Sequence, residues 1–155
     1  MPTFPNARYL FAKQEFEYWK KLPKNEIEDD RAGIKDSVLP VFNAGRVDLI
    51  SVNHSVTDEV SLIPTPGHTP SHVSVFIESQ GKQAVITGDA VHHPCQVAHP
   101  DWYTLADTDK KTATESRRAL FERFANGETL VIGSHFAQPT AGYLTKGYGG
   151  YTFRT

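Results

Sequence analysis

Three short apolar runs of the sequence each lead to a glycine and then, within two residues, to a side chain that can bind a metal ion. Apolar runs of this length, bounded by glycine or proline, are typical of buried strands. If these strands lie in one sheet, we expect the side chains that follow them to emerge near the same edge. Imidazole and carboxylate together suit zinc or a similar first-row metal, and one carboxylate can bridge two ions. The candidate ligands are His68, Asp89 and His135.

The segment around His68 contains a second histidine, His72, at a spacing that would place both on one face of a helix. Pro66, Gly67 and Pro70 exclude a helix here, because proline removes a backbone donor and restricts the residue before it. The segment is therefore predicted to be a loop. It leads into an alternating run typical of a strand, so it places a side chain at the mouth of that strand, where ligands and catalytic groups usually lie.

The N-terminal part of the chain favours helices. One is predicted over Lys13–Leu22, where Pro23 ends it, and a second from about Asp36 to Ala44, with Gly45 as the stop. Residues 24–34 between them form a predicted charged linker. Its acidic cluster could hold a hard cation or be a solvated loop; the cluster consists of Glu26, Glu28, Asp29 and Asp30.

From residue 47 onward the pattern changes to strands. A long helix interrupts them, with Asp109 as its predicted N-cap and Ala125 near its end. A stripe on this helix is predicted to face the core: Ala113, Arg117, Leu120, Phe121 and Phe124. The predicted strands are 47–52, 59–63, 73–78, 83–87 and 129–133, followed by a hairpin over 143–153. Helices mixed with mainly antiparallel strands predict an α+β layered domain.

Length and charge exclude several classes of protein. At 155 residues the chain is expected to form a single domain, 1–155. The net charge of -2 and the lack of a basic run argue against a nucleic-acid-binding protein. No apolar run approaches the roughly 20 residues of a membrane helix, and Met1-Pro2-Thr3-Phe4-Pro5 does not resemble a signal peptide. With a single cysteine, the chain is interpreted as cytoplasmic, with no membrane partner.

Three motifs, taken together, resemble one protein family. Gly-His-Thr-Pro-Ser-His (67–72), Thr-Gly-Asp-Ala-Val-His-His (87–93) and Gly-Ser-His-Phe (133–136) resemble the C-terminal half of metallo-β-lactamase-fold hydrolases in order and spacing. The branch most similar to them contains N-acyl homoserine lactone lactonases and methyl parathion hydrolase-like enzymes. The resemblance covers nearly the whole chain, from residues 4–19 through 86–102 to 133–142.

This resemblance implies a role for each candidate residue. His68 resembles the histidine that completes the first metal site, Asp89 the carboxylate that bridges both metals, and His135 the histidine that completes the second. His72 resembles a loop histidine that is not a ligand and makes structural hydrogen bonds. His92 lies three residues after the bridging aspartate, where some lactonases carry a tyrosine near the substrate carbonyl. Asp89 and His92 are therefore the candidate catalytic residues, and His92 is otherwise a loop neighbour of His93 and His99.

One expected motif is missing. The family signature His-x-His-x-Asp-His supplies four of the seven usual ligands, and the sequence contains no such stretch. We therefore interpret the chain as the C-terminal half of an αββα sandwich, with a mixed, mainly antiparallel sheet and flanking helices. Two zinc ions are expected in the intact parent, and partial or no zinc in this chain. Uncovered apolar strands such as 73–77 and 130–132 predict a homodimer or higher oligomer.

The implied function is that of a zinc-dependent hydrolase fragment. In the parent, a metal-bound hydroxide would attack a small-molecule ester or lactone. A serine nucleophile is not expected, since the sequence has no Gly-x-Ser-x-Gly elbow. The isolated chain is expected to be inactive unless another chain contributes ligands. Two alternatives remain open: a non-catalytic oligomerising domain, and a phosphotriesterase or β-lactamase of the same superfamily.

Overall fold

The computed structural model describes residues 2–21 and 33–155. They form two compact units, Met1–Ser51 and Val52–Thr155. The expectation of one domain over 1–155 stays a prediction. The charged linker expected at 24–34 lies almost wholly outside the described residues, and so does its acidic cluster of Glu26, Glu28, Asp29 and Asp30.

The first unit pairs two short parallel strands, β1 (Tyr9–Ala12) and β2 (Val47–Ile50). Helix α1 (Lys13–Lys21) confirms the first predicted helix, and its Phe16 is 5% exposed between the rings of Phe11 and Phe42. The second predicted helix is present with an earlier start. It begins as the π-helical turn η1 (Ile34–Val38), continues as α3 (Leu39–Asn43), and ends before Gly45 in the left-handed region, with φ of 65°.

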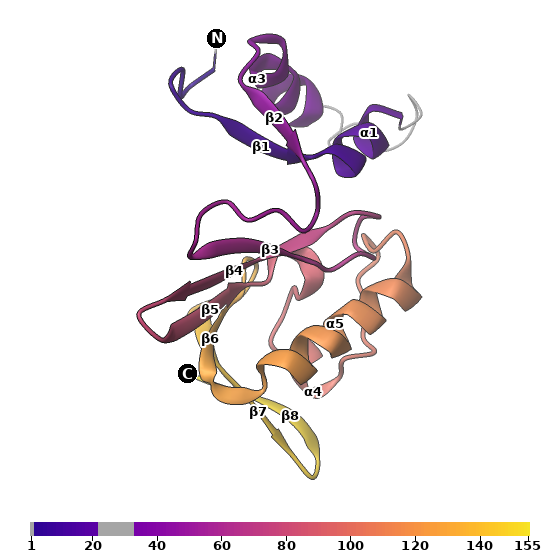
Figure 1. Ribbon diagram of the computed structural model, residues 1–155. Coiled ribbons are helices and arrows are strands. Elements are labelled where there is room, and N and C mark those ends of the chain that lie inside the picture. Colours follow the sequence, from indigo (N-terminus) through magenta and orange to yellow (C-terminus); the bar gives the residue numbers. More distant parts are fainter. Residues whose placement is uncertain (1, 22–32) are drawn as a thin grey trace. The chain divides into compact units, whose positions relative to one another are not determined.

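The second unit is built on a six-stranded sheet in the order β3-β4-β5-β6-β7-β8 (Figure 1). Only β5 and β6 are parallel; the other neighbours in this sheet are antiparallel. Strands β3, β5 and β6 therefore run in the same direction, and their C-terminal ends lie at one edge. The mixed, mainly antiparallel sheet confirms the predicted α+β class. The strands are β3 (Val60–Pro64), β4 (Val73–Ser79), β5 (Lys82–Ile86), β6 (Asn126–Ile132), β7 (Ala141–Gly147) and β8 (Gly150–Arg154).

The predicted turns between strands have the expected backbone. Ser79 pairs with Lys82 across the two-residue turn of Gln80 and Gly81, which have φ of 51° and 72°. Two positive φ values match the twist of a tight hairpin. Strand β6 starts three residues earlier than predicted, because Asn126 already pairs with Thr145 ahead of an irregularity in the ladder.

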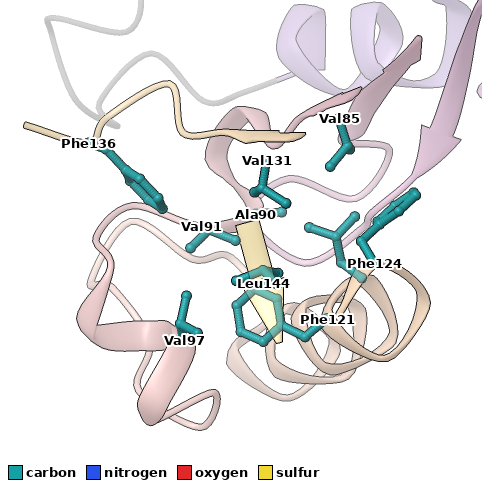
Figure 2. Packing of buried hydrophobic residues seen from close by; sticks show 10 residues of the cluster. Val85, Ala90, Val91, Val97, Phe121, Phe124, Val131, Phe136 and Leu144 are labelled. Atoms are coloured by element: carbon teal, nitrogen blue, oxygen red, sulfur yellow. The ribbon is translucent and has the colours of Figure 1, made fainter. Parts of the chain in front are cut away.

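Helix α5 (Lys110–Phe124) packs on one face of this sheet, and its predicted stripe is buried at all five positions. The Asp109 side chain accepts hydrogen bonds from the backbone N–H groups of Lys111 and Thr112, which confirms the predicted N-cap. Phe121 and Phe124 of the helix meet Val85, Val131 and Leu144 of the sheet in the core (Figure 2). The 3-10 turn η2 (Gly88–Ala90) and helix α4 (Cys95–Ala98) complete the unit.

Among the described residues, no helix combines the length and apolarity needed to cross a bilayer.

Candidate metal centre

Three loops at the shared sheet edge bring the three predicted ligands together. His68 lies in the loop after β3, Asp89 in η2 after β5, and His135 after β6. Each oxygen of the Asp89 carboxylate faces a different histidine: Oδ1 lies 2.5 Å from Nε2 of His135, and Oδ2 lies 3.4 Å from Nε2 of His68. These residues lie together because β3, β5 and β6 run in the same direction and end at the same edge of the sheet.

The glycines that precede two of these ligands allow the chain to pass close to its neighbours. Gly67 has φ of 129°, and a Cβ there would lie 2.1 Å from the backbone nitrogen of Ala113. Gly88 has φ of 55°, and a Cβ there would lie 2.7 Å from Nε2 of His72. Both positions therefore require glycine for backbone conformation and for space.

Both ring nitrogens of His72 have hydrogen-bond partners, and these contacts support the site. Its Nε2 accepts the backbone N–H of Asp89 at 2.9 Å, which requires the proton to be on Nδ1. Nδ1 lies 3.2 Å from the carbonyl oxygen of Thr65 and 2.9 Å from its hydroxyl. These contacts give His72 the structural hydrogen-bonding arrangement that the sequence resemblance implied.

A buried aspartate, Asp107, stands behind His68. Its Oδ1 lies 3.2 Å from Nδ1 of His68, and its side chain is fully buried. A carboxylate on the second nitrogen of a histidine fixes the ring orientation and makes the other nitrogen a better ligand. The loop is also fastened by its backbone, because Thr108 and Asp109 donate N–H groups to the carbonyls of His68 and Gly67.

Arg117 of helix α5 holds Asp107 in place. Its Nη2 lies 3.6 Å from Oδ2 of Asp107, and neither side chain is exposed. Its Nε donates to the carbonyl of Ala90, and its Nη1 donates to those of Pro100 and Trp102. Sequence reasoning placed Arg117 in the core but missed its partner. The available signal was the arginine itself, since a buried cation needs an acidic neighbour.

His92 joins the same cluster. Its ring lies 4.9 Å from that of His135, nearly parallel at 14°, and 5.1 Å from that of His68. Within the described residues, its Nδ1 is buried and has no hydrogen-bond partner. Burial, and then the nearby His68, lower the pKa of His92, which favours the neutral ring. The residue expected to face a substrate thus lies directly among the candidate ligands.

The electrostatics of Asp89 favour its ionised form. Burial acts to raise the pKa of Asp89, but the His135 hydrogen bond and the histidines His68, His72 and His135 outweigh it. The net effect is a pKa below the usual value for aspartate. A carboxylate that is ionised at neutral pH is the form that binds a cation.

The remaining histidines lie in other arrangements. His93 is exposed, and its Nδ1 accepts the backbone N–H of Cys95. The ring of His99 stacks on that of Trp102 at 4.3 Å. The backbone carbonyl of His54 accepts a hydrogen bond from the backbone N–H of Leu62. These contacts are local and separate from the Asp89 cluster.

The donor chemistry fits a first-row metal such as zinc. One ligand atom each from Asp89, His92 and His135 lie within 4.8 Å of one another, and His68 borders this group. Neutral imidazoles around one carboxylate form a typical zinc donor set. The buried, unpartnered Nδ1 of His92 also fits a site that takes a cation.

The chain is similar to several known hydrolases. The N-acyl homoserine lactonase of Bacillus thuringiensis is 29% identical over 103 residues, which make up 66% of this chain and 39% of that protein. The solved hydrolase AbOPH of the beta lactamase superfamily superposes with a TM-score of 0.83 at 27% identity. AidC, a dizinc quorum-quenching lactonase solved with its product, gives a TM-score of 0.80 at 24% identity. Both structural matches cover 97% of this chain and 55% of the other.

The chain therefore spans about half the length of its solved relatives, and less of the curated lactonase. The family model described as the metallo-beta-lactamase superfamily matches residues 2–135. That match covers most of the chain, so this protein belongs to the metallo-beta-lactamase superfamily.

Proposed function

We propose that the chain supplies the Asp89 half of the metal centre in a hydrolase that opens a lactone or an ester. The observation that carries the proposal is the Asp89 carboxylate, whose two oxygens face His135 and His68 at 2.5 Å and 3.4 Å. This is the arrangement expected of a bridging carboxylate with one histidine on each side. The lactonase names of the relatives support the substrate class.

The residues have separate tasks in this proposal. In a complete centre, with the further ligands contributed by another polypeptide, His68 and His135 would each hold a metal, and the Asp89 carboxylate would offset the charge between them. A bound metal would supply Lewis acidity and lower the pKa of a bound water towards about 7. His72 keeps Asp89 in place through its backbone N–H, and Asp107 keeps the His68 ring directed at the centre.

The cluster is accessible from one side. The side chains of His135 and Asp89 are 50% and 36% exposed, whereas that of His68 is 17% exposed. A substrate would therefore approach past His135. The four further ligands of the family signature are not in this sequence, so we expect turnover to require a polypeptide that contributes them.

Zinc content after loading and desalting, measured by elemental analysis, tests the proposal. We expect zinc in the wild-type chain and none in a variant carrying His68→Gln, Asp89→Asn and His135→Gln. His54→Gln is the matched control, because it removes a histidine outside the cluster. Equal zinc in the wild type and the triple variant, or none in the wild type, would overturn the proposal. Circular dichroism confirms that the triple variant is folded.

A non-catalytic oligomerising domain is the second candidate. Its support is the sheet face opposite α5, where strand alternation places apolar side chains together. They are only partly buried: Leu62, Val75, Ile77, Ile86, Leu130 and Ile132. We propose that copies of the chain associate through this face. Light scattering at micromolar concentration is expected to give a dimer or larger, and a monomer would contradict this candidate.

A further inference from the structure

The metal ligands derived from the resemblance leave His92 unexplained. His68, Asp89 and His135 come from two different metal sites, so each site would keep one histidine and a share of one carboxylate. Such a set binds zinc poorly, because structural zinc takes four ligands and catalytic zinc takes three from the protein. The structure places a further imidazole beside them, that of His92, three residues after Asp89.

We propose that His92 is a metal ligand, and that this chain builds one mononuclear zinc site from Asp89, His92 and His135, with His68 as its fourth donor. The inference rests on the proposed metal-binding function and concerns the chain by itself, whereas the two-metal centre would need the polypeptide that contributes the further ligands. Three of these side chains already offer ligand atoms within 4.8 Å of one another. Ligand atoms in a tetrahedral zinc site lie about 3.3 Å apart, so modest side-chain rotation closes the set.

The backbone that carries His92 is firmly held. Its N–H donates at 2.7 Å to Oε1 of Gln96, which is 4% exposed. The residue before it, Val91, is 1% exposed in the core, and the carbonyl of Ala90 accepts a hydrogen bond from Arg117. His92 is therefore presented to the cluster by a fixed scaffold. That is the support a ligand needs to meet the other donors.

The ring of His92 gives a second reason for a ligand role. Its Nδ1 is buried without a hydrogen-bond partner, although buried ring nitrogens are usually paired. Its neighbours are the rings of His135 and His68, at 4.9 Å and 5.1 Å. A cation bound between these imidazoles and the Asp89 carboxylate would explain why they lie together, because the ligand nitrogen of each ring would then face a positive charge.

His93 offers a matched control. It is the next residue and the same side-chain type, but it is exposed and its Nδ1 accepts the backbone N–H of Cys95. His92→Gln and His93→Gln therefore remove the same chemical group from the same loop. Only the first should affect the metal.

Zinc affinity is measured by competition with a chromophoric chelator, and stoichiometry by titration calorimetry. We expect one zinc per wild-type chain, and a loss of affinity in His92→Gln beyond the roughly 100-fold upper range of outer-shell changes. His93→Gln should bind like the wild type. Ring proton–nitrogen spectra of the wild-type chain give a second measurement that needs no variant: the His92 resonances should shift when zinc is added.

The outcomes separate this inference from the proposed function. No zinc in the wild-type chain overturns both. Wild-type affinity in His92→Gln, with the His92 ring signals unmoved by zinc, overturns the ligand role alone and leaves His92 the substrate-contacting role that the resemblance implies. Two zinc ions per chain would overturn the mononuclear site.

Discussion

The two sides of the Asp89 carboxylate differ in how firmly their histidines are held. On one side, His68 is 17% exposed and has Asp107 at its second nitrogen, with Arg117 behind that. On the other side, the side chain of His135 is 50% exposed, and it contacts the Asp89 oxygen and the stacked ring of His92. One histidine is fixed by a buried ion pair, and the other is fixed by the cluster itself.

The two sides differ in preorganisation. The His68 side is set by the fold before any metal arrives, because its supports belong to helix α5 and the loop ahead of it. The orientation of His135 depends on its partner, so a bound metal would order that side more. Substitutions behind His68 should therefore affect folding and metal binding together, whereas those around His135 should leave folding largely intact.

The largest expected effect comes from Arg117→Leu. This substitution leaves the carboxylate of Asp107 buried without its cation and removes donors from three backbone carbonyls. Breaking a buried pair in this way typically lowers the free energy of unfolding by about 3–5 kcal/mol. Urea denaturation should show this loss in Arg117→Leu. The exposed neighbour Arg118→Leu serves as the control and should stay close to the wild type.

An Arg117→Leu variant as stable as the Arg118→Leu control would mean that the ion pair does not support the His68 side. The firmer hold on His68 would then have no basis in this ion pair. Cleavage by a protease under native conditions gives an independent check, because loss of the pair should expose the loop before α5 more than the loop that carries His135.

A smaller effect is expected from Asp107→Asn, which also removes the charge opposite Arg117 but keeps the shape of the side chain and leaves the three carbonyl acceptors of Arg117 in place. The second nitrogen of His68 then loses its carboxylate, and loss of such an outer partner typically weakens metal affinity by about 10–100-fold. Zinc competition measures the change. Asp109→Asn is the matched control, since it makes the same substitution two residues away and asparagine is an equally good N-cap.

Two results would contradict this prediction. If Asp107→Asn binds zinc like the wild type, the carboxylate does not set the His68 ligand. If Asp109→Asn weakens zinc binding as much, the effect comes from the loop as a whole. If the His68 ring signals change in the Asp107→Asn variant while those of His135 stay the same, Asp107 supports the His68 side alone.

Most of the sheet and the long helix could be predicted from local pattern. Alternating apolar residues predicted β4 and β5, and the stripe on α5 predicted five buried positions that are all buried. Element ends were less predictable, as with the early start of β6, because pairing of Asn126 with Thr145 is decided by a distant strand. Local sequence carries periodicity well, but it does not carry register.

The cluster could be predicted only as far as strand direction allows. His68, Asp89 and His135 follow strands that end at the same edge. Their common pattern of an apolar run, a glycine and a metal-binding side chain was therefore enough to predict that they lie together. Asp107 could not be found this way, since it lies in a loop, and its contact with His68 spans 39 positions. The position of His92 among the candidate ligands depends on the path of the loop after η2, which the core residue Val91 and the buried Gln96 determine.

The smallest expected effect concerns Asp109, which caps α5 where the His68 loop is fastened. Hydrogen bonds from the Thr112 side chain and backbone, and from the Lys111 backbone, outweigh a small effect of burial and lower the pKa of Asp109. A lowered pKa in the folded state stabilises the protein above the unfolded pKa, near 3.9, and this contribution is lost as pH falls through the folded value. Asp109→Ala should therefore lower Tm at pH 7 by roughly 2–4 °C.

Thermal unfolding from pH 7 to pH 3 should show the gap in Tm between wild type and variant closing below about pH 4. A gap that is constant with pH would mean that the cap acts without its charge.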